Sequence, residues 1–597
     1  MSANLEAFLA GQPGGQNADV KEARGGQGAA TAFLEHARAA LAAKNAALSP
    51  ARRKCNALLQ KSIKLFGKEK YRDAALTALD ATRADPTAAQ AFHMLALSLE
   101  RLGHLHKAFE MYERSFKLDP TDADLYLNLG LAAWKLDLLD GAERVFRLCI
   151  ERRPDAPQGY NNLGAVLRDK GKFAEAIDVL QAAITRMPDK AILWNTVGTV
   201  LGEQGDFEQS QIFYREALRL DPKFGRALHN IGFALSHTGD LDGALENYRQ
   251  ALPLAETELD RFEIHHAMSM CLAGTGELAK SWPLYETRHE PLFRTSILFA
   301  LKAPMWRGED VTGKKMLLVG EQGLGDEIMF AGLVPDMAER VGPNGNLMIA
   351  SDPRLVPLFK RSFPGVECRG YANTRHNAKG VRLVPWAAGA HAPDVFAPMG
   401  TPLQYLRSDV RDFDGQTAFL KPDPERVAPW REKLAASGRP VVGICWRSML
   451  MSTDRKKYYS PLDVWAKALK GQDVTLVSLQ YGDCKSDLAY ARESLGLEIV
   501  EIEGLDLKND LDGAAALSAA CDLVVSAPTA AAALAAATGA ETWFVVAGRV
   551  WPQLGTDHYP WYPKTRAFWP ERFGDWTSVM AQVEKALRER TAARAAA

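Results

Sequence analysis

A glycine-rich turn with a carboxylate lies between an apolar run and a helical segment. The run Met316–Gly323 is typical of a strand that ends in this turn. Gly323, Gly325 and Asp326 belong to the turn. Glycine lets the backbone approach a ligand, and a carboxylate just beyond would face the same ligand. Asp326 is equally placed to cap the helix that begins near Glu327. The turn is a candidate ligand site, with capping as the alternative.

A second candidate site follows the expected strand Pro440–Trp446, which ends with Trp446 and Arg447. The polar loop beyond it carries three cations: Arg455, Lys456 and Lys457. Clustered cations suit a bound phosphate. An exposed basic loop without a ligand is the alternative.

A third candidate site is the segment Ser526–Gly539, where a strand ends and a helix of small residues begins. Such a helix start exposes backbone N–H groups and the positive end of the helix dipole to a phosphate. Ser526 and Thr529 add hydroxyls, and Pro528 lies between them.

These sites need a scaffold, and the second half of the chain supplies short apolar runs that alternate with helical segments. Strands of this kind are typical of parallel sheets covered on both faces. The expected strands are Met316–Gly323, Asn346–Ala350, Arg382–Trp386, Pro440–Trp446, Val474–Gln480, Cys521–Ala527 and Glu541–Ala547. They form two groups separated near Asp423–Pro440, which predicts two doubly wound subdomains facing a cleft.

The first half is dominated by a repeat of 34 residues. Four series share this period: Pro86, Pro120, Pro154, Pro188 and Pro222; Gly130, Gly164, Gly198 and Gly232; Ala74, Ala108, Ala142, Ala176, Ser210 and Ala244; and Gly103, Gly171, Gly205 and Gly239, with Asp137 in the missing place. Small residues let paired helices approach, and glycine and proline end them. The pattern resembles the tetratricopeptide repeat, and it predicts stacked helix pairs from about residue 50 to 290.

The period slips after Pro222, because the glycine expected near residue 273 is Gly276. About three residues enter near Glu256–Arg261, and an atypical last pair would run to about His289. A mobile leader is expected for residues 1–49, with a helix at Thr31–Ala47.

A polar series accompanies the repeat on the first helix of each pair. Its members are Asn128, Asn162, Thr196 and Asn230. An asparagine amide both donates and accepts, so a row of them on an inner wall would hold the backbone of an acceptor polypeptide. The series resembles the asparagine-lined groove of the O-GlcNAc transferases, and a solvated polar face is the alternative.

Composition excludes several classes of protein. The formal net charge is -1, so neither nucleic acid nor an anionic membrane is an expected partner. The N-terminus lacks the pattern of a secretory signal, and no run of about 18 apolar residues predicts membrane insertion. Seven scattered cysteines without a CxxC pair predict reduced thiols, with no disulfide framework or zinc site. We expect a cytoplasmic location.

Several motifs together resemble a known family. EQGLGDEIMFAGLVP, GICWR, VSLQYG, CDLVVSAPT and HYPWYP occur in the order seen in bacterial proteins in which tetratricopeptide repeats precede a heptosyltransferase-like GT-B glycosyltransferase domain. The chain is most similar to soluble flagellin glycosyltransferases, from about residue 60 to 590, including the junction Ser281–Glu290. The resemblance implies an α-solenoid (residues 50–290) followed by an α/β GT-B fold with two Rossmann-like subdomains (291–435, acceptor side, and 436–597, nucleotide-sugar side).

The resemblance also implies residue roles. Asp326 would be the general base, with Glu321 and Glu327 as weaker alternatives. The implied nucleotide-sugar contacts are Gly323, Gly325, Trp446, Arg447, Arg455, Lys456, Gln480, Tyr481, Ser526, Pro528 and Thr529. Pro528 and Ala533 stand where the family usually has aspartate and histidine, which points to a different donor sugar or to lost activity.

The C-terminal part has two further features. An aromatic loop, Gly548–Phe568, would contribute His558, Tyr559, Trp561 and Tyr562 as sugar or acceptor contacts, with structural packing as the alternative. The last helix, from Trp576 to about Arg590, would cross back onto the first subdomain, as in GT-B folds.

The implied activity is transfer of a sugar to Ser or Thr hydroxyls of flagellin, or of a similar polypeptide held by the repeats, with roles in flagellum assembly and motility. The donor would be a nonulosonic acid such as pseudaminic acid, activated with CMP. No metal or other cofactor is expected, because cations and a helix end would stabilise the leaving phosphate. Two alternatives remain: a non-catalytic adaptor or chaperone with a degenerate transferase fold, and a transferase for a small glycan or lipid-linked acceptor.

Overall fold

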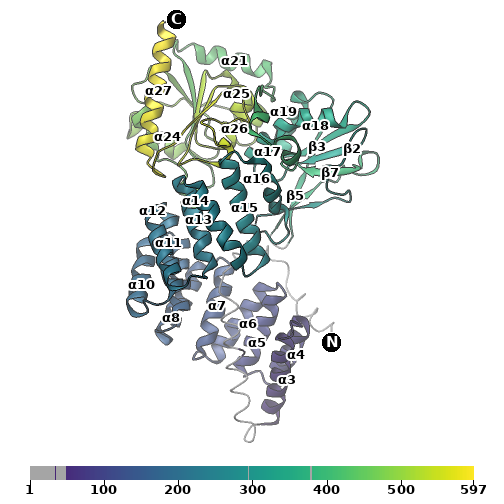
Figure 1. Ribbon diagram of the computed structural model, residues 1–597, viewed down its shortest axis with the longest axis vertical. Coiled ribbons are helices and arrows are strands. Elements are labelled where there is room, and N and C mark those ends of the chain that lie inside the picture. Colours follow the sequence, from purple (N-terminus) through teal and green to yellow (C-terminus); the bar gives the residue numbers. More distant parts are fainter. Residues whose placement is uncertain (1–33, 35–48, 294, 377–378, 597) are drawn as a thin grey trace. The chain divides into compact units, whose positions relative to one another are not determined.

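The computed structural model describes Leu34 and residues 49–293, 295–376 and 379–596 (Figure 1). The predicted leader, and the helix predicted at Thr31–Ala47, fall outside the described residues except for Leu34 and Ser49. The Ser49 hydroxyl accepts from the Arg52 N–H at 3.2 Å and caps the first helix of the repeats, α3.

Short helices fill residues 50–285, and the two helices of a pair contact each other, as α5 does α6. They are α3 (Pro50–Phe66), α4 (Tyr71–Ala84), α5 (Ala89–Arg101), α6 (Leu105–Leu118), α7 (Ala123–Lys135), α8 (Leu139–Arg152), α9 (Pro157–Asp169), α10 (Phe173–Arg186), α11 (Ala191–Gln204), α12 (Phe207–Leu220), α13 (Gly225–Thr238), α14 (Leu241–Ala251), α15 (Glu258–Gly274) and α16 (Leu278–Tyr285). The helical repeat predicted from the 34-residue period is confirmed.

The turn inside each pair contains a left-handed residue at the predicted period. The angle φ is positive at Gly103, Gly171, Gly205 and Gly239. It is also positive at Asp137 (61°), where the series lacks its glycine, and at Glu69 (58°), which lies 34 residues before Gly103. The backbone therefore keeps the same helix-ending turn where the glycine is missing, at a conformational cost that aspartate bears better than most residues.

The second glycine series lies inside helices, where it allows close packing. A Cβ at Gly130 would lie 2.5 Å from the Phe146 ring, and one at Gly232 would lie 2.7 Å from the Tyr248 ring. Real Cβ atoms do not approach so closely, so any larger residue would push the paired helices apart.

The predicted slip in the repeat is present. Helix α15 has 17 residues against 14 in α13, and its start is fixed by a capping box in which Thr257 and Asp260 bond to each other's backbone N–H. The next left-handed turn accordingly falls at Gly276.

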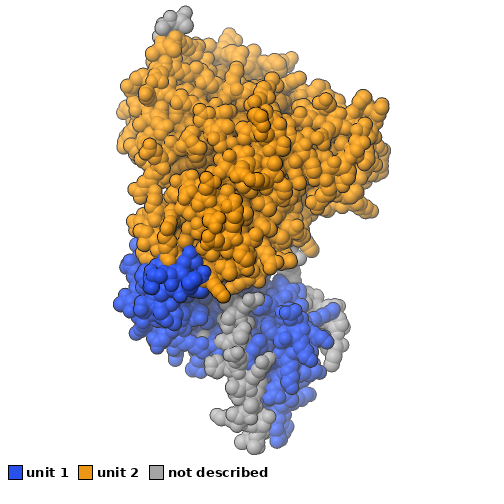
Figure 2. Space-filling model, in the orientation of Figure 1, with its two compact units in different colours: residues 1–201, 216–222 blue, residues 202–215, 223–597 orange. Residues whose placement is uncertain are grey.

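The chain divides into two compact units, residues 1–201 with 216–222 and residues 202–215 with 223–597, which Figure 2 colours separately. The second unit contains helices α13 to α16 as well as the sheets. The boundary between the compact units therefore falls inside the repeats, whereas the change from helices to strands lies between His289 and Ile297.

Two parallel sheets form the α/β region. The first has the order β4-β3-β2-β7 and the second the order β12-β11-β10-β8-β9. Their strands are β2 (Lys315–Val319), β3 (Asn346–Ser351), β4 (Glu367–Gly370), β7 (Val395–Pro398), β8 (Val441–Cys445), β9 (Thr475–Ser478), β10 (Leu523–Ser526), β11 (Thr542–Val545) and β12 (Thr565–Phe568). Helix α21 (Pro424–Ala435) connects the two groups, in the segment predicted to separate them.

A third, small sheet was not predicted. It has the order β1-β6-β5, with β1 (Ile297–Ala300) parallel and β5 (Ala372–His376) antiparallel to β6 (Lys379–Leu383). The run Arg382–Trp386, predicted as a strand of a large parallel sheet, instead forms the end of β6 and the loop after it.

The two large sheets are covered differently. In the second sheet, Val442 and Ile444 pack with helices α23 (Leu462–Leu469) and α27 (Trp576–Ala596), while Val441 and Cys445 pack with α21, α25 (Leu511–Ala520) and α26 (Ala530–Ala537). This sheet is doubly wound, as predicted.

The first sheet is not doubly wound. Leu318 and Ile349 face helices α18 (Val334–Val341) and α19 (Val356–Ser362). On the other face, Leu317 and Met348 pack with Tyr371, Val384 and Phe299, from the small sheet and the segments beside it. The prediction of two doubly wound subdomains is therefore wrong for the first.

The last helix also differs from the prediction. Val579, Met580 and Val583 of α27 pack into the core of the second sheet, and Arg594 pairs with Asp522 at 2.9 Å. The helix contacts α23 and β12 instead of crossing back onto the first subdomain. Its apolar face is already used by the sheet that precedes it.

None of the described helices combines the length and the apolar character needed to cross a membrane. All seven cysteines are buried free thiols.

Candidate functional site

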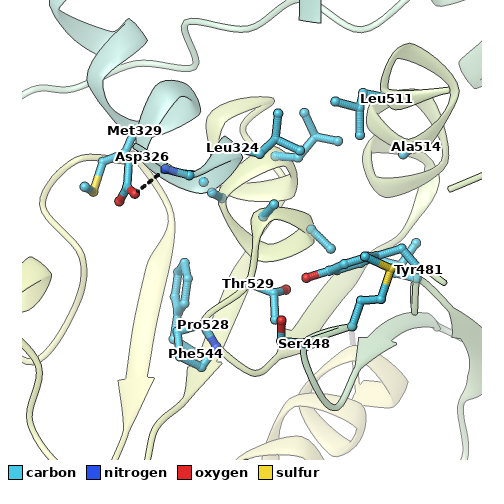
Figure 3. A pocket seen from close by; sticks show the side chains of 18 of the residues that line it. Leu324, Asp326, Met329, Ser448, Tyr481, Leu511, Ala514, Pro528, Thr529 and Phe544 are labelled. Atoms are coloured by element: carbon cyan, nitrogen blue, oxygen red, sulfur yellow. Dashed lines mark hydrogen bonds between the residues drawn. The ribbon is translucent and has the colours of Figure 1, made fainter. Parts of the chain in front are cut away.

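A cavity of about 640 Å³ lies at the carboxyl ends of both large sheets (Figure 3). In the second sheet the strand order reverses between β8 and β10, because β9 lies on one side of β8 and β10 on the other. Ser448 follows β8, Thr529 follows β10, and both line the cavity. The turn after the central strand β2 of the first sheet lines it too. Ligands in open α/β folds bind at such positions.

The turn from the first sheet brings Gly323, Gly325 and Asp326, three residues of the predicted site, to the lining of the cavity. Gly323 caps α17 (Leu324–Phe330), and the Asp326 carboxylate accepts from the Gly323 N–H at 3.1 Å. A Cβ at Gly325 would lie 3.7 Å from the backbone of Ala530, the first residue of α26. The two helix starts therefore face each other across a narrow gap.

Asp326 has the electrostatics of a proton acceptor at neutral pH. Its pKa is raised from 3.8 to about 6, mainly because the carboxyl is buried and also because the Glu321 carboxylate is near. The Gly323 N–H and the Arg288 guanidinium oppose this shift. A carboxyl with such a pKa is ionised at pH 7 and still basic enough to take a proton.

Glu321 and Glu327, the weaker candidates for a base, are absent from the cavity lining. Glu321 is 1% exposed and accepts from Arg288 Nε at 2.7 Å and from the Gly400 N–H at 2.6 Å. Burial raises the pKa of Glu327 to about 7, and the carboxylate accepts from the Tyr371 hydroxyl. Both carboxylates hold the fold around the turn.

On the side of the second sheet, four predicted residues line the cavity: Arg455, Tyr481, Pro528 and Thr529. In Figure 3 the hydroxyls of Ser448, Tyr481 and Thr529 gather on one side, and the Asp326 carboxylate lies on the other. Thr529 is the N-cap of α26 and makes no side-chain capping bond, so the N–H groups of this helix start are left to a ligand.

The other predicted nucleotide-sugar residues do not line the cavity. Ser526 is fully buried and donates to the Ala527 carbonyl at 2.7 Å, and Lys456 is exposed outside the lining. Trp446 is 1% exposed in the core of the second sheet, where its indole donates to Asp487 at 2.9 Å. Arg447 Nε donates to the same carboxylate at 2.7 Å. Direct contact of these residues with a nucleotide-sugar is not supported.

Gln480 was also predicted to contact the ligand, but it holds the loop after β8. It is 3% exposed, and its Oε1 accepts from the N–H groups of Trp446 and Arg447, both at 3.1 Å. Its Nε2 donates to the Arg447 carbonyl at 2.8 Å. The amide thereby fixes the path of the chain toward Ser448.

Two cations at the cavity escaped prediction. Arg354 follows β3 and is held by the Asp352 carboxylate, with two contacts of 2.9 Å. It also donates to the Lys508 carbonyl at 2.9 Å, and Lys508 lines the cavity as well. The rule that ligands bind at the carboxyl ends of strands would have found Arg354, whereas Lys508 precedes a helix and carries no such signal.

The floor of the cavity is aromatic. Tyr559 and Tyr562 line it, and the Tyr559 ring stacks on Phe544 with centroids 3.9 Å apart. Tyr559 is 4% exposed, and its hydroxyl has no hydrogen-bond partner in the described part of the chain. Burial raises its pKa. A buried phenol without a partner is costly, so it is a natural donor to a bound ligand.

The other two aromatic candidates lie elsewhere. Trp561 is 3% exposed, packs against Phe413 and donates to the Pro552 carbonyl at 2.8 Å. His558 pairs with Asp557 at 3.0 Å and is absent from the lining. Structural packing therefore describes Trp561, whereas the His558 side chain, 43% exposed, neither packs in the core nor lines the cavity.

The polar series of the repeats is not a row of exposed amides. Asn128 is 3% exposed, and its amide lies 3.0 Å from His93 Nε2. Asn162 is 3% exposed and accepts from the Asn161 amide at 2.9 Å, while Thr196 is 4% exposed and donates to the Asn161 side chain. Asn230 is half-buried. The prediction that this series holds an acceptor backbone is therefore not supported for its buried members.

Within the described residues, no group of three or more His, Cys, Asp or Glu side chains is arranged to hold a metal ion.

Comparison with known proteins supports the repeats. Models of the tetratricopeptide repeat match residues 93–157, 155–223 and 213–246. Protein FlbA of Caulobacter vibrioides is 40% identical over 324 residues, which is 54% of this chain and 54% of that protein. The chain thus spans about half the length of this curated relative.

Two solved structures of TPR proteins are similar to part of the chain. A thermophilic TPR protein of Thermus thermophilus is 26% identical, covering 30% of this chain and 99% of its own, with a TM-score of 0.28. YrrB is described as a TPR protein with an unusual peptide-binding site. It is 18% identical, the match covers 31% of this chain and 95% of YrrB, and the TM-score is 0.24. Because the repeat models match residues 93–246, these residues are tetratricopeptide repeats. An α/β region built on parallel sheets follows the repeats.

Proposed function

We propose that this protein is a glycosyltransferase of the GT-B type that transfers a sugar from a nucleotide-activated donor to a hydroxyl of a polypeptide. One observation carries the proposal: a cavity at the carboxyl ends of two parallel sheets has a carboxyl of pKa about 6 on one wall and cations with an open helix start on the other. Attack on an activated sugar requires both a proton acceptor and a site for the leaving phosphate.

Asp326 is the general base in this proposal. It takes the proton of the acceptor hydroxyl as that oxygen forms a bond to the anomeric carbon, while the bond from this carbon to the phosphate oxygen breaks. The electron pair of the broken bond stays on the leaving nucleotide. The bond from the Gly323 N–H engages Asp326 Oδ2 and fixes the direction of the carboxylate.

The leaving phosphate is stabilised from the second sheet. Arg455 and Lys508 supply positive charge, and Ser448, Tyr481 and Thr529 supply hydroxyl donors. The first N–H groups of α26 add the positive end of a helix dipole. Pro528 and Ala533 line this wall in place of the usual aspartate and histidine, and neither is needed for the backbone donors.

The acceptor polypeptide is assigned to the repeats, because tetratricopeptide arrays bind peptides and proteins. Flagellin as the acceptor, and a CMP-activated nonulosonic acid as the donor, come from the family resemblance of the α/β motifs. The buried Asn128 and Asn162 amides give no support to recognition through an asparagine row.

Co-expression tests the proposal. The chain is produced with flagellin and the enzymes that make the nucleotide-sugar, and the flagellin is weighed by intact mass spectrometry. A gain of one or more sugar masses is expected with the wild type and not with Asp326→Asn. A stable complex without any mass gain would instead identify an adaptor, and full transfer by Asp326→Asn would remove Asp326 as the base.

A further inference from the structure

The loop that carries Arg455 has two faces. Residues 453–456 form a short helix, α22 (Thr453–Lys456), and Tyr459 follows shortly after it. Arg455 and Tyr459 line the cavity. Lys457 and Tyr458 lie between them in the sequence and bond to residues outside the cavity. The segment therefore contacts both the cavity and a second part of the fold.

That second structure is the last part of the repeats. Lys457 Nζ lies 2.8 Å from the Glu203 carboxylate, and the lysine side chain is only 7% exposed. The Tyr458 hydroxyl lies 2.9 Å from His237 Nε2. Glu203 belongs to α11 and His237 to α13, and both lie in the compact unit that contains the sheets.

His237 is held so that it accepts from Tyr458. Its Nδ1 lies 2.8 Å from the Phe233 carbonyl oxygen, which can only accept, so Nδ1 carries the proton of the neutral ring. Nε2 is then left to accept from the Tyr458 hydroxyl. The imidazole is packed among Phe207, Phe233 and Phe573, with centroids 4.4, 4.3 and 5.4 Å away. This aromatic cluster fixes the position of Tyr458 relative to the repeats.

The opposite wall of the cavity is held in the same way. The Tyr285 hydroxyl, at the end of α16, donates to Gln322 Oε1 at 3.1 Å. Arg288 is 3% exposed and binds the Glu321 carboxylate with contacts of 2.7 and 3.1 Å. Glu321 and Gln322 directly precede Gly323, the residue whose N–H binds Asp326.

We infer that the last repeat helices position both walls of the cavity: Tyr285 and Arg288 set the Asp326 turn, and His237 and Glu203 set the Arg455 loop. These residues are positioning residues, since none of them lines the cavity. The roles given to the two walls rest on the proposed function. The repeats thereby contribute to the geometry of the transfer site as well as to binding of the acceptor.

Two conservative variants of the full chain test the inference. Tyr458→Phe removes the bond to His237 and keeps the ring, and Tyr285→Phe removes the bond to Gln322. With Tyr458→Phe we expect the KM for the donor to rise about two- to tenfold, the size of one net hydrogen bond, with kcat little changed. With Tyr285→Phe we expect kcat to fall by a similar factor with the donor KM little changed. Equal effects of both variants on kcat and KM would overturn the inference.

Hydrogen exchange followed by mass spectrometry reads the two contacts without any substrate. Tyr458→Phe is expected to speed exchange in residues 453–459 and not in 320–328, and Tyr285→Phe is expected to do the reverse. Tyr126→Phe is the matched control, since its buried hydroxyl donates to the Pro120 carbonyl in the repeats and contacts neither loop. Unchanged exchange in both loops would refute the inference, whereas wild-type chain without transfer but with the expected exchange pattern would refute only the proposed function.

Discussion

The Asp326 carboxylate accepts a hydrogen bond from the Gly323 backbone N–H at 3.1 Å while it lines the cavity. The two interpretations of this residue, helix cap and ligand-facing carboxylate, are therefore compatible. The capping bond holds the carboxylate in one orientation, and burial supplies the pKa of about 6 that a base needs.

The pH dependence of transfer follows from that pKa. Only ionised Asp326 accepts a proton, so kcat should be level above pH 7 and fall about tenfold per unit as the pH drops below about 6. Asp326→Asn should lower kcat by about 10²- to 10⁴-fold at pH 7.5, the usual contribution of a general base. Initial rates from pH 5 to 8.5 check this, and a wild-type profile that is flat through pH 6 would contradict it.

The same carboxyl should lower the stability of the fold at neutral pH. Its pKa in the folded protein is about 6, above the usual 3.8. The free energy of unfolding should therefore decrease as the pH rises from about 3.8 to about 6, and the loss is complete above pH 6. Asp326→Asn should therefore raise the free energy of unfolding on the order of 1–3 kcal/mol at pH 8 and change it little at pH 4. Urea denaturation at both pH values measures the difference, and an equal change at both would contradict the burial of a charge.

Cations on the phosphate side should govern donor binding. Arg455→Gln and Lys508→Gln should each weaken binding of the nucleotide-sugar about three- to thirtyfold, as expected for a charge-assisted hydrogen bond at an exposed site. The effect should shrink as salt is added. Lys456→Gln is the matched control, since Lys456 is exposed next to Arg455 and outside the cavity lining. Isothermal titration with the donor gives the affinities; equal losses in all three variants would show a general charge effect.

Tyr559 should contribute to ligand binding at the expense of stability. Tyr559→Phe removes a buried hydroxyl that has no partner in the described chain, so the melting temperature should stay the same or rise. Donor affinity should nevertheless fall about two- to tenfold, the value of one hydrogen bond. Tyr126→Phe should lose stability instead, because its hydroxyl is paired. A loss of stability in Tyr559→Phe with unchanged affinity would assign Tyr559 to the core alone.

Close helix packing at Gly130 should make the repeats intolerant of any larger residue at this position. Gly130→Ala places a methyl against the Phe146 ring and should destabilise the protein by about 1–3 kcal/mol. Gly141→Ala is the control, because Gly141 lies inside α8 and a Cβ there would be 3.9 Å from its nearest neighbour, Leu138. Alanine also favours a helix over glycine by up to about 1 kcal/mol. Thermal unfolding of both variants checks the pair, and equal shifts would argue against a steric cause.

The sequence predicted the structure best where one residue type is specific to one backbone conformation. The glycine series predicted the left-handed turns, including the shift to Gly276, because few other residues adopt a positive φ without strain. Asp137 occupies the same conformation, and its place was visible only from the period. Apolar runs likewise located the central strands of both large sheets.

Pattern alone failed where burial decides the role of a residue. Asn128 and Trp446 look like surface groups for recognition, but both are buried and bonded within the chain. The small sheet was missed because β5 is exposed along its whole length and has no apolar run. Lys508 reaches the cavity through a tertiary arrangement that no local spacing records.

The boundary between the compact units has a practical meaning for engineering and for evolution. Everything from Gly202 onward, apart from residues 216–222, is assigned to the unit that holds the sheets. Recombination that exchanges the repeats for those of another protein should therefore succeed when the crossover lies upstream of α11, near residue 190, and fail near residue 290. Acceptor specificity would then be free to diversify in the first repeats, while the last three helix pairs are inherited together with the transfer site.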